Sequence, residues 1–511
     1  MEALDWLVIG VFFLALIGII VWVVRQKQND SADYFLGGRD ATWLAIGASI
    51  FASNIGSEHL IGLAGAGASS GMAMAHWEIQ GWMILILGWV FVPFYSRSMV
   101  YTMPEFLERR YNPQSRTILS VISLVSYVLT KVAVTVYAGG LVFQQVFGIK
   151  ELWGIDFFWI AAIGLVVLTA LYTIFGGMKS VLYTSVLQTP ILLLGSLIIL
   201  VLGFKELGGW DEMMRVCGAV TVNDYGDTMT NLIRSNDDAN FPWLGALIGS
   251  AIIGFWYWCT DQFIVQRVLS GKNEKEARRG TIFGAYLKLL PVFLFLIPGM
   301  IAFALHQKYI GAGGEGFLPM LANGTANADA AFPTLVAKLL PAGVKGLVVC
   351  GILAALMSSL ASLFNSSAML FTIDFYKRFR PETPEKKLVG IGQIATVVIV
   401  ILGILWIPIM RSVGDVLYTY LQDVQSVLAP GIAAAFLLGI CWKRTSAQGG
   451  MWGLIAGMII GLTRLGAKVY YSNAGEVADS TFKYLFYDMN WLFFCGWMFL
   501  FCIIVVIVVS L

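Results

Sequence analysis

The sequence contains repeated apolar stretches that are long enough to cross a lipid bilayer. A spanning helix needs about 20 largely apolar residues, and thirteen stretches of this kind occur. Outer-membrane barrels have strands of about ten residues with alternating hydrophobicity, so this class is excluded. The stretches are Leu4–Val24, Thr42–Ala68, His76–Phe94, Thr117–Phe147, Trp153–Phe175, Val181–Phe204, Trp243–Leu269, Thr281–Leu305, Gly346–Phe375, Leu388–Ile409, Val416–Ile440, Met451–Val469 and Met489–Leu511. They predict an all-α integral membrane protein.

The composition excludes a soluble protein. Hydrophobic residues make up 58% of the chain and charged residues 13%, against roughly 45–50% and about 25% in soluble domains. The net charge of +2 gives no reason to expect a nucleic-acid partner. The longest loops are too short for an independent core, so we expect residues 1–511 to form a single transmembrane domain.

The distribution of basic residues predicts the orientation. If the N-terminus is outside, most of the 33 Lys and Arg residues, Arg267 among them, fall in cytoplasmic segments, as the positive-inside rule requires. The long loops at 205–242 and 306–345 then lie outside. We therefore expect a multi-pass protein of the cell membrane with its N-terminus outside and its C-terminus inside. The short termini favour a bacterial inner membrane.

Two of the predicted helices contain polar, glycine-containing interruptions. The second has Ala-Ser-Asn-Ile-Gly-Ser-Glu-His at 52–59, and the seventh has Gly-Phe-Trp-Tyr-Trp-Cys-Thr-Asp-Gln at 254–262. Each helix begins a run of five, at 42–204 and 243–440. Interrupted helices at matching places in two halves predict a transport site near the bilayer midplane, where freed carbonyls can bind a cation. The alternative is that Gly and Ser only permit close helix packing.

The ninth predicted helix carries hydroxyl groups suited to sodium. Ala355, Ser358 and Ser359 lie at positions i, i+3 and i+4 and therefore share one helix face. A hydroxyl oxygen is a neutral ligand that a sodium ion accepts. The alternative is that these serines bond back to helix carbonyls or simply pack as small residues.

Several ionisable residues lie inside predicted spans, where such residues are rare and usually functional. Four of them indicate a polar cavity, and they are Glu58, His59, Glu78 and Lys288. Lys131 is a further candidate. The alternative for each is a structural ion pair or a side chain that reaches to the interface, and for Arg464, near a helix end, we prefer that alternative.

Aromatic and amide side chains within the predicted spans are suited to binding a sugar. Trp256, Tyr257 and Trp258 follow the glycine of the seventh helix and lie too deep for an interfacial belt. An aromatic face can stack on the apolar face of a sugar ring. Gln422 and Gln425 on the eleventh helix can each donate and accept hydrogen bonds with hydroxyl groups.

From about residue 30 to residue 465, the chain resembles the solute:sodium symporter family, and within it the sodium/glucose cotransporters. The matching segments are Asp-Tyr-Phe-Leu-Gly-Gly-Arg at 33–39, Asn-Ile-Gly-Ser at 54–57, Tyr-Thr-Met-Pro-Glu-Phe at 101–106, Leu-Tyr-Thr-Ile-Phe-Gly-Gly at 171–177, Trp-Tyr-Trp-Cys-Thr-Asp-Gln at 256–262, Tyr-Leu-Lys-Leu at 286–289, Met-Ser-Ser at 357–359 and Phe-Asn-Ser at 364–366. The resemblance implies a leucine-transporter-like core of two inverted five-helix repeats. Helices 2–6 and 7–11 form the repeats, and helices 1, 12 and 13 are peripheral.

The resemblance also implies both binding sites. Sodium, the co-transported ion, is expected at the carbonyls of Ala52, Ile55 and Ala355 and the hydroxyls of Ser358 and Ser359. The sugar is expected in a pocket with Tyr257 as its inner gate and Trp258 beside the gate. The remaining residues of that pocket are Asn54, His59, Glu78, Lys288 and Gln422.

The chain departs from the family pattern at several places. Ser185 stands where the sixth helix usually has Asp, Ala361 stands where two-sodium members have a hydroxyl, and Asp423 adds a carboxylate near the pocket edge. Ser185 and Ala361 favour one sodium ion per sugar. Thirteen spans are predicted, whereas animal members have a fourteenth.

The leading hypothesis is a secondary active transporter in which inward sodium flow drives the uptake of a glucose- or galactose-like hexose. A myo-inositol or other polyol symporter is the alternative, because its hydroxyl ring presents similar groups. A sodium or sugar sensor without transport is a third possibility, and no signalling domain supports it. An enzyme is disfavoured, since the polar pocket shows neither a metal-ligand cluster nor a nucleophile–base pair. No obligate protein partner is evident.

Overall fold

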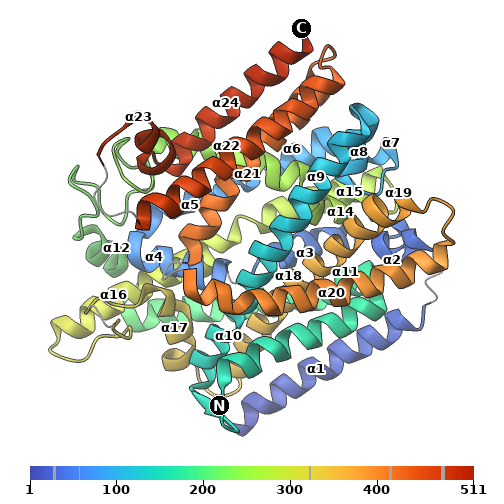
Figure 1. Cartoon of the computed structure of the whole chain (residues 1–511). Helices are drawn as coiled ribbons and strands as arrows, with labels where there is room; N and C mark the ends of the chain where they lie inside the picture. The colour runs from blue at the N-terminus through green and yellow to red at the C-terminus, as the bar shows by residue number, and fades with distance from the viewer. Residues whose placement is uncertain (27–29, 57, 322–323, 414–416, 474–477) are drawn as a thin grey trace.

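The protein is described by a computed structural model that covers residues 1–26, 30–56, 58–321, 324–413, 417–473 and 478–511. This part of the chain is predominantly helical (Figure 1). Its one sheet is a short antiparallel hairpin of β1 (Glu151–Leu152) and β2 (Ile155–Asp156), in which Glu151 pairs with Asp156. The all-α prediction is confirmed.

Ten helical stretches among the described residues are long and apolar enough to cross a membrane. Some of them hold two predicted spans. Helix α11 (Phe157–Leu207) joins the fifth and sixth spans, and Gly177, at φ 52° and ψ −148°, breaks the helical geometry between them. Only glycine fits there, because a Cβ would lie 2.4 Å from the Tyr34 carbonyl oxygen. The membrane class is confirmed, and the count of thirteen spans stays a prediction.

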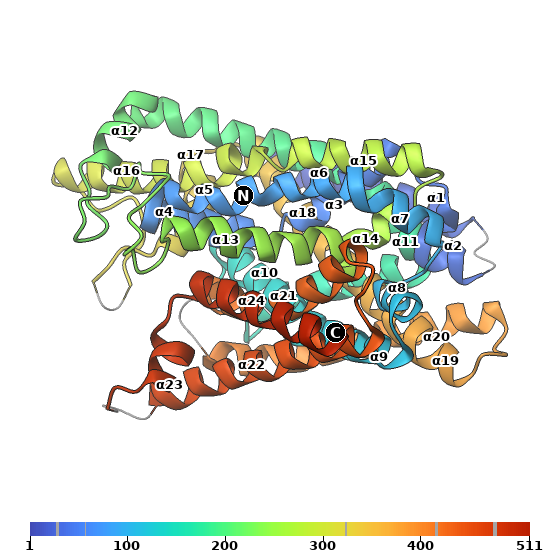
Figure 2. The same ribbon diagram turned by 90° about the horizontal axis from the view of Figure 1, so that it is seen from above.

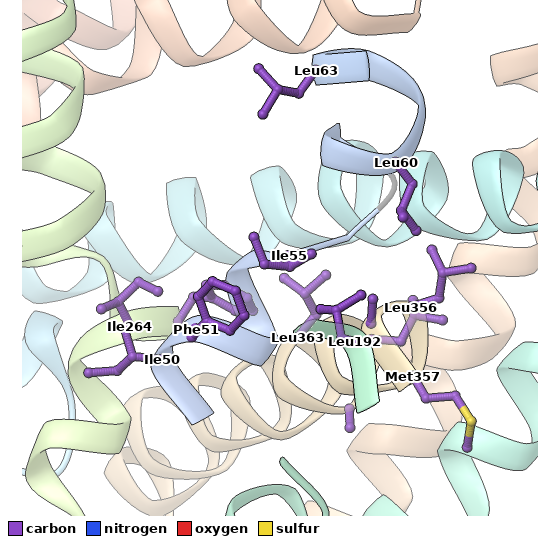
Figure 3. Close-up of a cluster of buried hydrophobic side chains, with 14 of the residues drawn as sticks. Ile50, Phe51, Ile55, Leu60, Leu63, Leu192, Ile264, Leu356, Met357 and Leu363 are labelled. Carbon is purple, nitrogen blue, oxygen red and sulfur yellow. The ribbon is translucent and has the colours of Figure 1, made fainter. Parts of the chain in front are cut away.

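The second predicted helix is interrupted in its middle. Helix α3 (Trp43–Asn54) ends where Ile55 adopts extended backbone with ψ 108°. The chain continues as a π-helical segment, η2 (Glu58–Leu63), and then as α4 (Ala64–Ser70). Figure 3 shows Ile55 at the end of α3, with Leu60 and Leu63 on the segment beyond the break. The Ile55 N–H still donates to the Phe51 carbonyl, but the carbonyls after Phe51 have no following helical turn to donate to them.

The seventh predicted helix is interrupted in the same manner. Helix α13 (Trp243–Gly254) widens into the π-helical segment η7 (Phe255–Thr260), and Asp261 then adopts extended backbone with ψ 128°. Its side chain accepts a hydrogen bond from the Phe263 N–H and so caps α14 (Gln262–Leu269). Both interruptions predicted from glycine and polar residues are confirmed.

Two long helices pack along each other. Helix α18 (Val344–Met369) packs along α11, and α1 (Ala3–Val24) packs against both. Helix α15 (Glu274–Leu287) packs along α3. On another side, α21 (Leu417–Cys441), α22 (Ala447–Asn473) and α24 (Trp491–Ser510) pack together, as Figure 1 shows.

Shorter helices gather at the two ends of the molecule. Helices α12 (Trp210–Gly218), α16 (Ile297–Gly311) and α17 (Ala331–Leu339), which include parts of the two loops predicted to be outside, lie at one end (Figure 2). Helices α2 (Ser31–Leu36), α8 (Met103–Arg110) and α19 (Lys377–Phe379), from segments predicted to be cytoplasmic, lie at the other. The remaining α-helices are α5 (Ala75–Ile79), α6 (Met83–Ile86), α7 (Val92–Ser98), α9 (Pro113–Ser126), α10 (Ala133–Phe147), α20 (Glu385–Val413) and α23 (Thr481–Lys483). The short 3-10 and π segments are η1 (Gly37–Arg39), η3 (Gly71–Met74), η4 (Gln80–Trp82), η5 (Leu87–Phe91), η6 (Tyr127–Val132), η8 (Val292–Leu296), η9 (Ala328–Ala330), η10 (Leu370–Tyr376) and η11 (Tyr484–Asp488).

Candidate functional site

Three of the ionisable residues singled out in the sequence meet beside the break that follows α3. Glu78 on α5 places Oε2 2.6 Å from Lys288 Nζ and Oε1 3.3 Å from His59 Nε2. Lys288 Nζ and His59 Nε2 are 2.8 Å apart. Glu78 is only 1% exposed, Lys288 is 3% exposed and His59 is 4% exposed. We call them the triad. The carboxylate and the ammonium group balance each other's charge.

Aromatic residues of η7 connect the triad to the end of α3. Lys288 Nζ lies 5.6 Å from the centroid of the Trp258 ring, and the rings of Trp258 and Tyr257 meet edge to face at 4.9 Å. The Asn54 amide donates a 3.0 Å hydrogen bond to the Tyr257 hydroxyl. Asn54 Oδ1 is buried and has no hydrogen-bond partner among the described residues. This acceptor is suited to a ligand hydroxyl.

The residues predicted to bind sodium come from the end of α3 and the middle of α18. All five are buried, namely Ala52, Ile55, Ala355, Ser358 and Ser359. A Cβ built on Gly56 would lie 3.4 Å from Ser359 Oγ, so α18 approaches the break closely. The hydroxyl of Ser358 lies 3.5 Å from that of Ser53, the neighbour of Ala52. Every one of these groups offers a neutral oxygen, which suits a monovalent hard cation.

Other sequence-selected residues have different surroundings. Lys131 forms an ion pair with Asp261, with Nζ 2.7 Å from Oδ2. Arg464 is 1% exposed and donates to the Met489 carbonyl at 2.8 Å. Gln422 lies within α21, but its side chain, like those of Glu58 and Asp423, is outside the described residues.

Arg267 has surroundings that the sequence did not predict. It lies on α14 and its side chain is completely buried. Its Nε donates to the hydroxyls of Ser49 and Ser53 on α3, at 3.2 and 3.1 Å. No local pattern in the sequence indicated that two serines of α3 would accept hydrogen bonds from this side chain.

The interrupted helices, with buried polar groups at each break, define a membrane transporter. The chain matches the model of the Sodium:solute symporter family over residues 34–457. It belongs to this family and is therefore a sodium-coupled symporter.

The chain is similar to both sugar and inositol cotransporters. It is 38% identical to sodium/glucose cotransporter 1 of Ovis aries over 100% of this chain and 79% of the relative. It is also 38% identical to sodium/myo-inositol cotransporter 2 of Homo sapiens, over 91% of this chain and 70% of the relative. Sodium/glucose cotransporter 2 of Rattus norvegicus is 38% identical over 96% and 75%.

Solved structures agree on the fold. A substrate-bound, outward-open Na+-coupled sialic acid symporter aligns with a TM-score of 0.79 at 22% identity, covering 100% of this chain and 97% of the other. MhsT in complex with L-phenylalanine aligns with a TM-score of 0.55 at 12% identity, covering 92% and 99%. The leucine-transporter-like fold predicted from the sequence is confirmed.

Proposed function

We propose that the chain couples inward sodium flow to the uptake of a neutral, glucose- or galactose-like hexose by alternating access. The observation that supports this most is the triad beside Trp258 and Asn54. Its carboxylate accepts hydrogen bonds and its ammonium group donates them, so together they match the two roles of a sugar hydroxyl. The net charge of Glu78 and Lys288 is zero, which suits a neutral substrate.

The pocket that we propose consists of the triad, Asn54, Trp258 and Gln422, with Tyr257 as the inner gate. The hydrogen bond from Asn54 to Tyr257 holds the gate against α3. The edge-to-face contact of Tyr257 with Trp258 joins the gate to the residue beside Lys288. A hexose bound there contacts both interrupted helices, and its binding can thereby bias their arrangement.

Sodium binds, in this proposal, to the carbonyls of Ala52, Ile55 and Ala355 and to the hydroxyls of Ser358 and Ser359. The carbonyls at the end of α3 lack helical donors, and α18 supplies its hydroxyls close to Gly56. Asn54 lies between Ala52 and Ile55 in the chain. Ion binding that orders the break therefore also orders a sugar ligand, which couples the two binding events.

A polyol such as myo-inositol is the second candidate substrate. Relatives of both kinds share 38% identity with this chain. A cyclic polyol offers the same alternation of donor and acceptor hydroxyls to the triad. It lacks the ring oxygen and the hydroxymethyl group of a hexose, so competition between the two ligands distinguishes them.

We also propose that the N-terminus is outside and the C-terminus inside, in a bacterial inner membrane. The segments rich in Lys and Arg gather at one end of the molecule, opposite the loops rich in Asn, Asp and Gly (Figure 2). Basic segments near span ends face the cytoplasm. Labelling of single introduced cysteines at residues 224 and 382 from the two sides of intact cells tests this orientation.

Uptake into proteoliposomes tests the transport proposal. Radiolabelled glucose, galactose and myo-inositol are compared under an inward sodium gradient and under an equal choline gradient. We expect sodium-dependent hexose accumulation. Preferential accumulation of myo-inositol would replace the hexose by the polyol, and saturable binding without uptake would favour a sensor.

A further inference from the structure

A cluster of five serine hydroxyls includes the two that accept hydrogen bonds from the buried side chain of Arg267. Three helices contribute to this serine cluster, which consists of Ser49 and Ser53 on α3, Ser185 on α11, and Ser358 and Ser362 on α18. Ser53 Oγ lies 2.7 Å from Ser362 Oγ, and Ser185 Oγ lies 3.2 Å from Ser358 Oγ. The Ser185 hydroxyl also approaches Ser49 Oγ to 3.5 Å. Ser49 thus links Ser185 to the Arg267 guanidinium.

The guanidinium group itself is incompletely bonded. Its Nε reaches Ser49 and Ser53, and its centre lies 4.8 Å from the Phe263 ring centroid. Nη1 and Nη2 are buried and have no hydrogen-bond partner in the part of the chain that the structure describes. A buried ion without a counter-charge is very unfavourable, because burial removes its hydration.

Asp261, the acidic residue that immediately precedes the helix of Arg267, is already engaged. Asp261 caps α14, pairs with Lys131 and accepts a hydrogen bond from the Tyr127 hydroxyl. The serine cluster adds only neutral dipoles. On α11, Gln188 shares a helix face with Ser185. It is buried, and its amide has no hydrogen-bond partner among the described residues.

We propose that the Arg267 guanidinium and the serine cluster bind a small monovalent anion, with chloride as the ligand. A single positive charge calls for a single negative one, and complete burial favours a small anion. The unpaired guanidinium N–H groups are the main donors to such an ion, and the hydroxyls of Ser49, Ser53 and Ser358 can add to them. The hydroxyls of Ser185 and Ser362 donate to the carbonyls of Val181 and Ser358. The anion neutralises Arg267 between α3, α11 and α14.

The anion site also affects sodium binding, a consequence that rests on the proposed sodium ligands. Those ligands are all neutral, and Ser358 belongs both to them and to the serine cluster. Without the anion, the positive guanidinium repels sodium across Ser53 and Ser358. With the anion bound, the charge of Arg267 is neutralised and no longer repels sodium. We expect chloride to lower the sodium concentration for half-saturation by about tenfold, within the range of ordinary coupling energies.

Thermal unfolding of the purified full-length protein tests the site without sodium or sugar. Unfolding midpoints are measured in choline chloride and choline gluconate mixtures of equal ionic strength. We expect a saturable rise of the midpoint with chloride. Ser185→Asp places a carboxylate beside Ser49 and should abolish this rise. Asn has the size of Asp but carries no charge, so Ser185→Asn should retain the rise.

A midpoint that does not depend on chloride in the unmodified protein would overturn the proposal, and so would an unchanged response in Ser185→Asp. Saturable binding of radioactive chloride by the unmodified protein, and its absence in Arg267→Met, provide a second measurement if Ser185→Asp fails to fold. Because neither assay contains sugar, failure of the anion site leaves hexose transport standing. Conversely, absence of hexose uptake leaves chloride binding untouched.

Discussion

Lys288 Nζ lies 2.6 Å from Oε2 of Glu78, and both side chains are almost completely excluded from solvent. A buried ion pair of this kind contributes little net stability, because desolvation offsets most of the attraction between the charges. Its value lies in positioning a donor and an acceptor side by side. In this protein the pair joins α5 to the end of α15, next to the break after α3.

Removing either partner of this pair should abolish hexose binding and also destabilise the protein. Glu78→Gln and Lys288→Met each leave one buried charge without its partner, which costs about 3–5 kcal/mol. The double variant leaves no unpaired charge, so we expect its unfolding midpoint to recover most of the loss, while hexose binding stays absent. Hexose binding by the stable double variant at normal affinity would place the pocket elsewhere.

Tyr257→Phe should weaken hexose transport without abolishing its sodium dependence. The substitution removes the hydroxyl that accepts from Asn54, an interaction worth about 1 kcal/mol. We expect the half-saturation concentration for hexose to rise several-fold in proteoliposome uptake. Tyr286→Phe, at an exposed tyrosine on α15, is the matched control and should behave like the unmodified protein. An equal half-saturation concentration for hexose in Tyr257→Phe and Tyr286→Phe would contradict the assignment of Tyr257 as the gate.

Ser359→Ala should weaken sodium binding more than it changes sugar selectivity. Loss of one hydroxyl ligand lowers affinity for the ion roughly 10–100-fold, equivalent to about 1.4–2.8 kcal/mol. The measurement is the sodium dependence of hexose uptake. Ser250→Ala is the control, because that buried serine donates to the Ala246 carbonyl on α13. An unaltered sodium half-saturation in Ser359→Ala would refute the ligand assignment.

One sodium ion should enter with each hexose. Ser185 and Ala361 are both buried. Ser185 lacks the carboxylate, and Ala361 lacks the hydroxyl, that the resemblance associates with a second cation site. One charge crossing 100 mV and a tenfold sodium gradient together provide about 3.7 kcal/mol, which limits accumulation to roughly 500-fold. Two ions would square that limit. Reversal potentials in proteoliposomes measure the number of sodium ions per hexose directly. A value of two would require a second cation site formed by other residues.

The fold and both helix breaks were predictable because hydrophobic length and interrupting polar residues are local signals. A run of apolar residues predicts a span wherever it lies, and Gly56 or Glu58 within such a run predicts a break. The triad was predictable as a group of buried ionisable residues. Its pairing was not, since the contact of Glu78 with Lys288 depends on how α5 meets α15.

Arg267 has surroundings that could not be predicted from the sequence. It follows an apolar run and resembles the basic residues that flank membrane spans. The hydroxyls that receive it come from α3, and the rest of the serine cluster comes from α11 and α18. Single serines in membrane helices are ordinarily packing residues, so no spacing within one helix indicated that the five would converge.

The break after α3 is common to both proposed sites, because Ala52 and Ile55 are assigned to sodium while Asn54 and His59 are assigned to the hexose. Isothermal titration of glucose into the purified protein, in sodium chloride and in choline chloride of equal concentration, tests this shared element. We predict that glucose binds at least about fivefold more tightly in sodium chloride. An ion that orders the break raises the affinity for the sugar, and the sugar raises the affinity for the ion by the same factor. Equal glucose affinity in the two salts would contradict it.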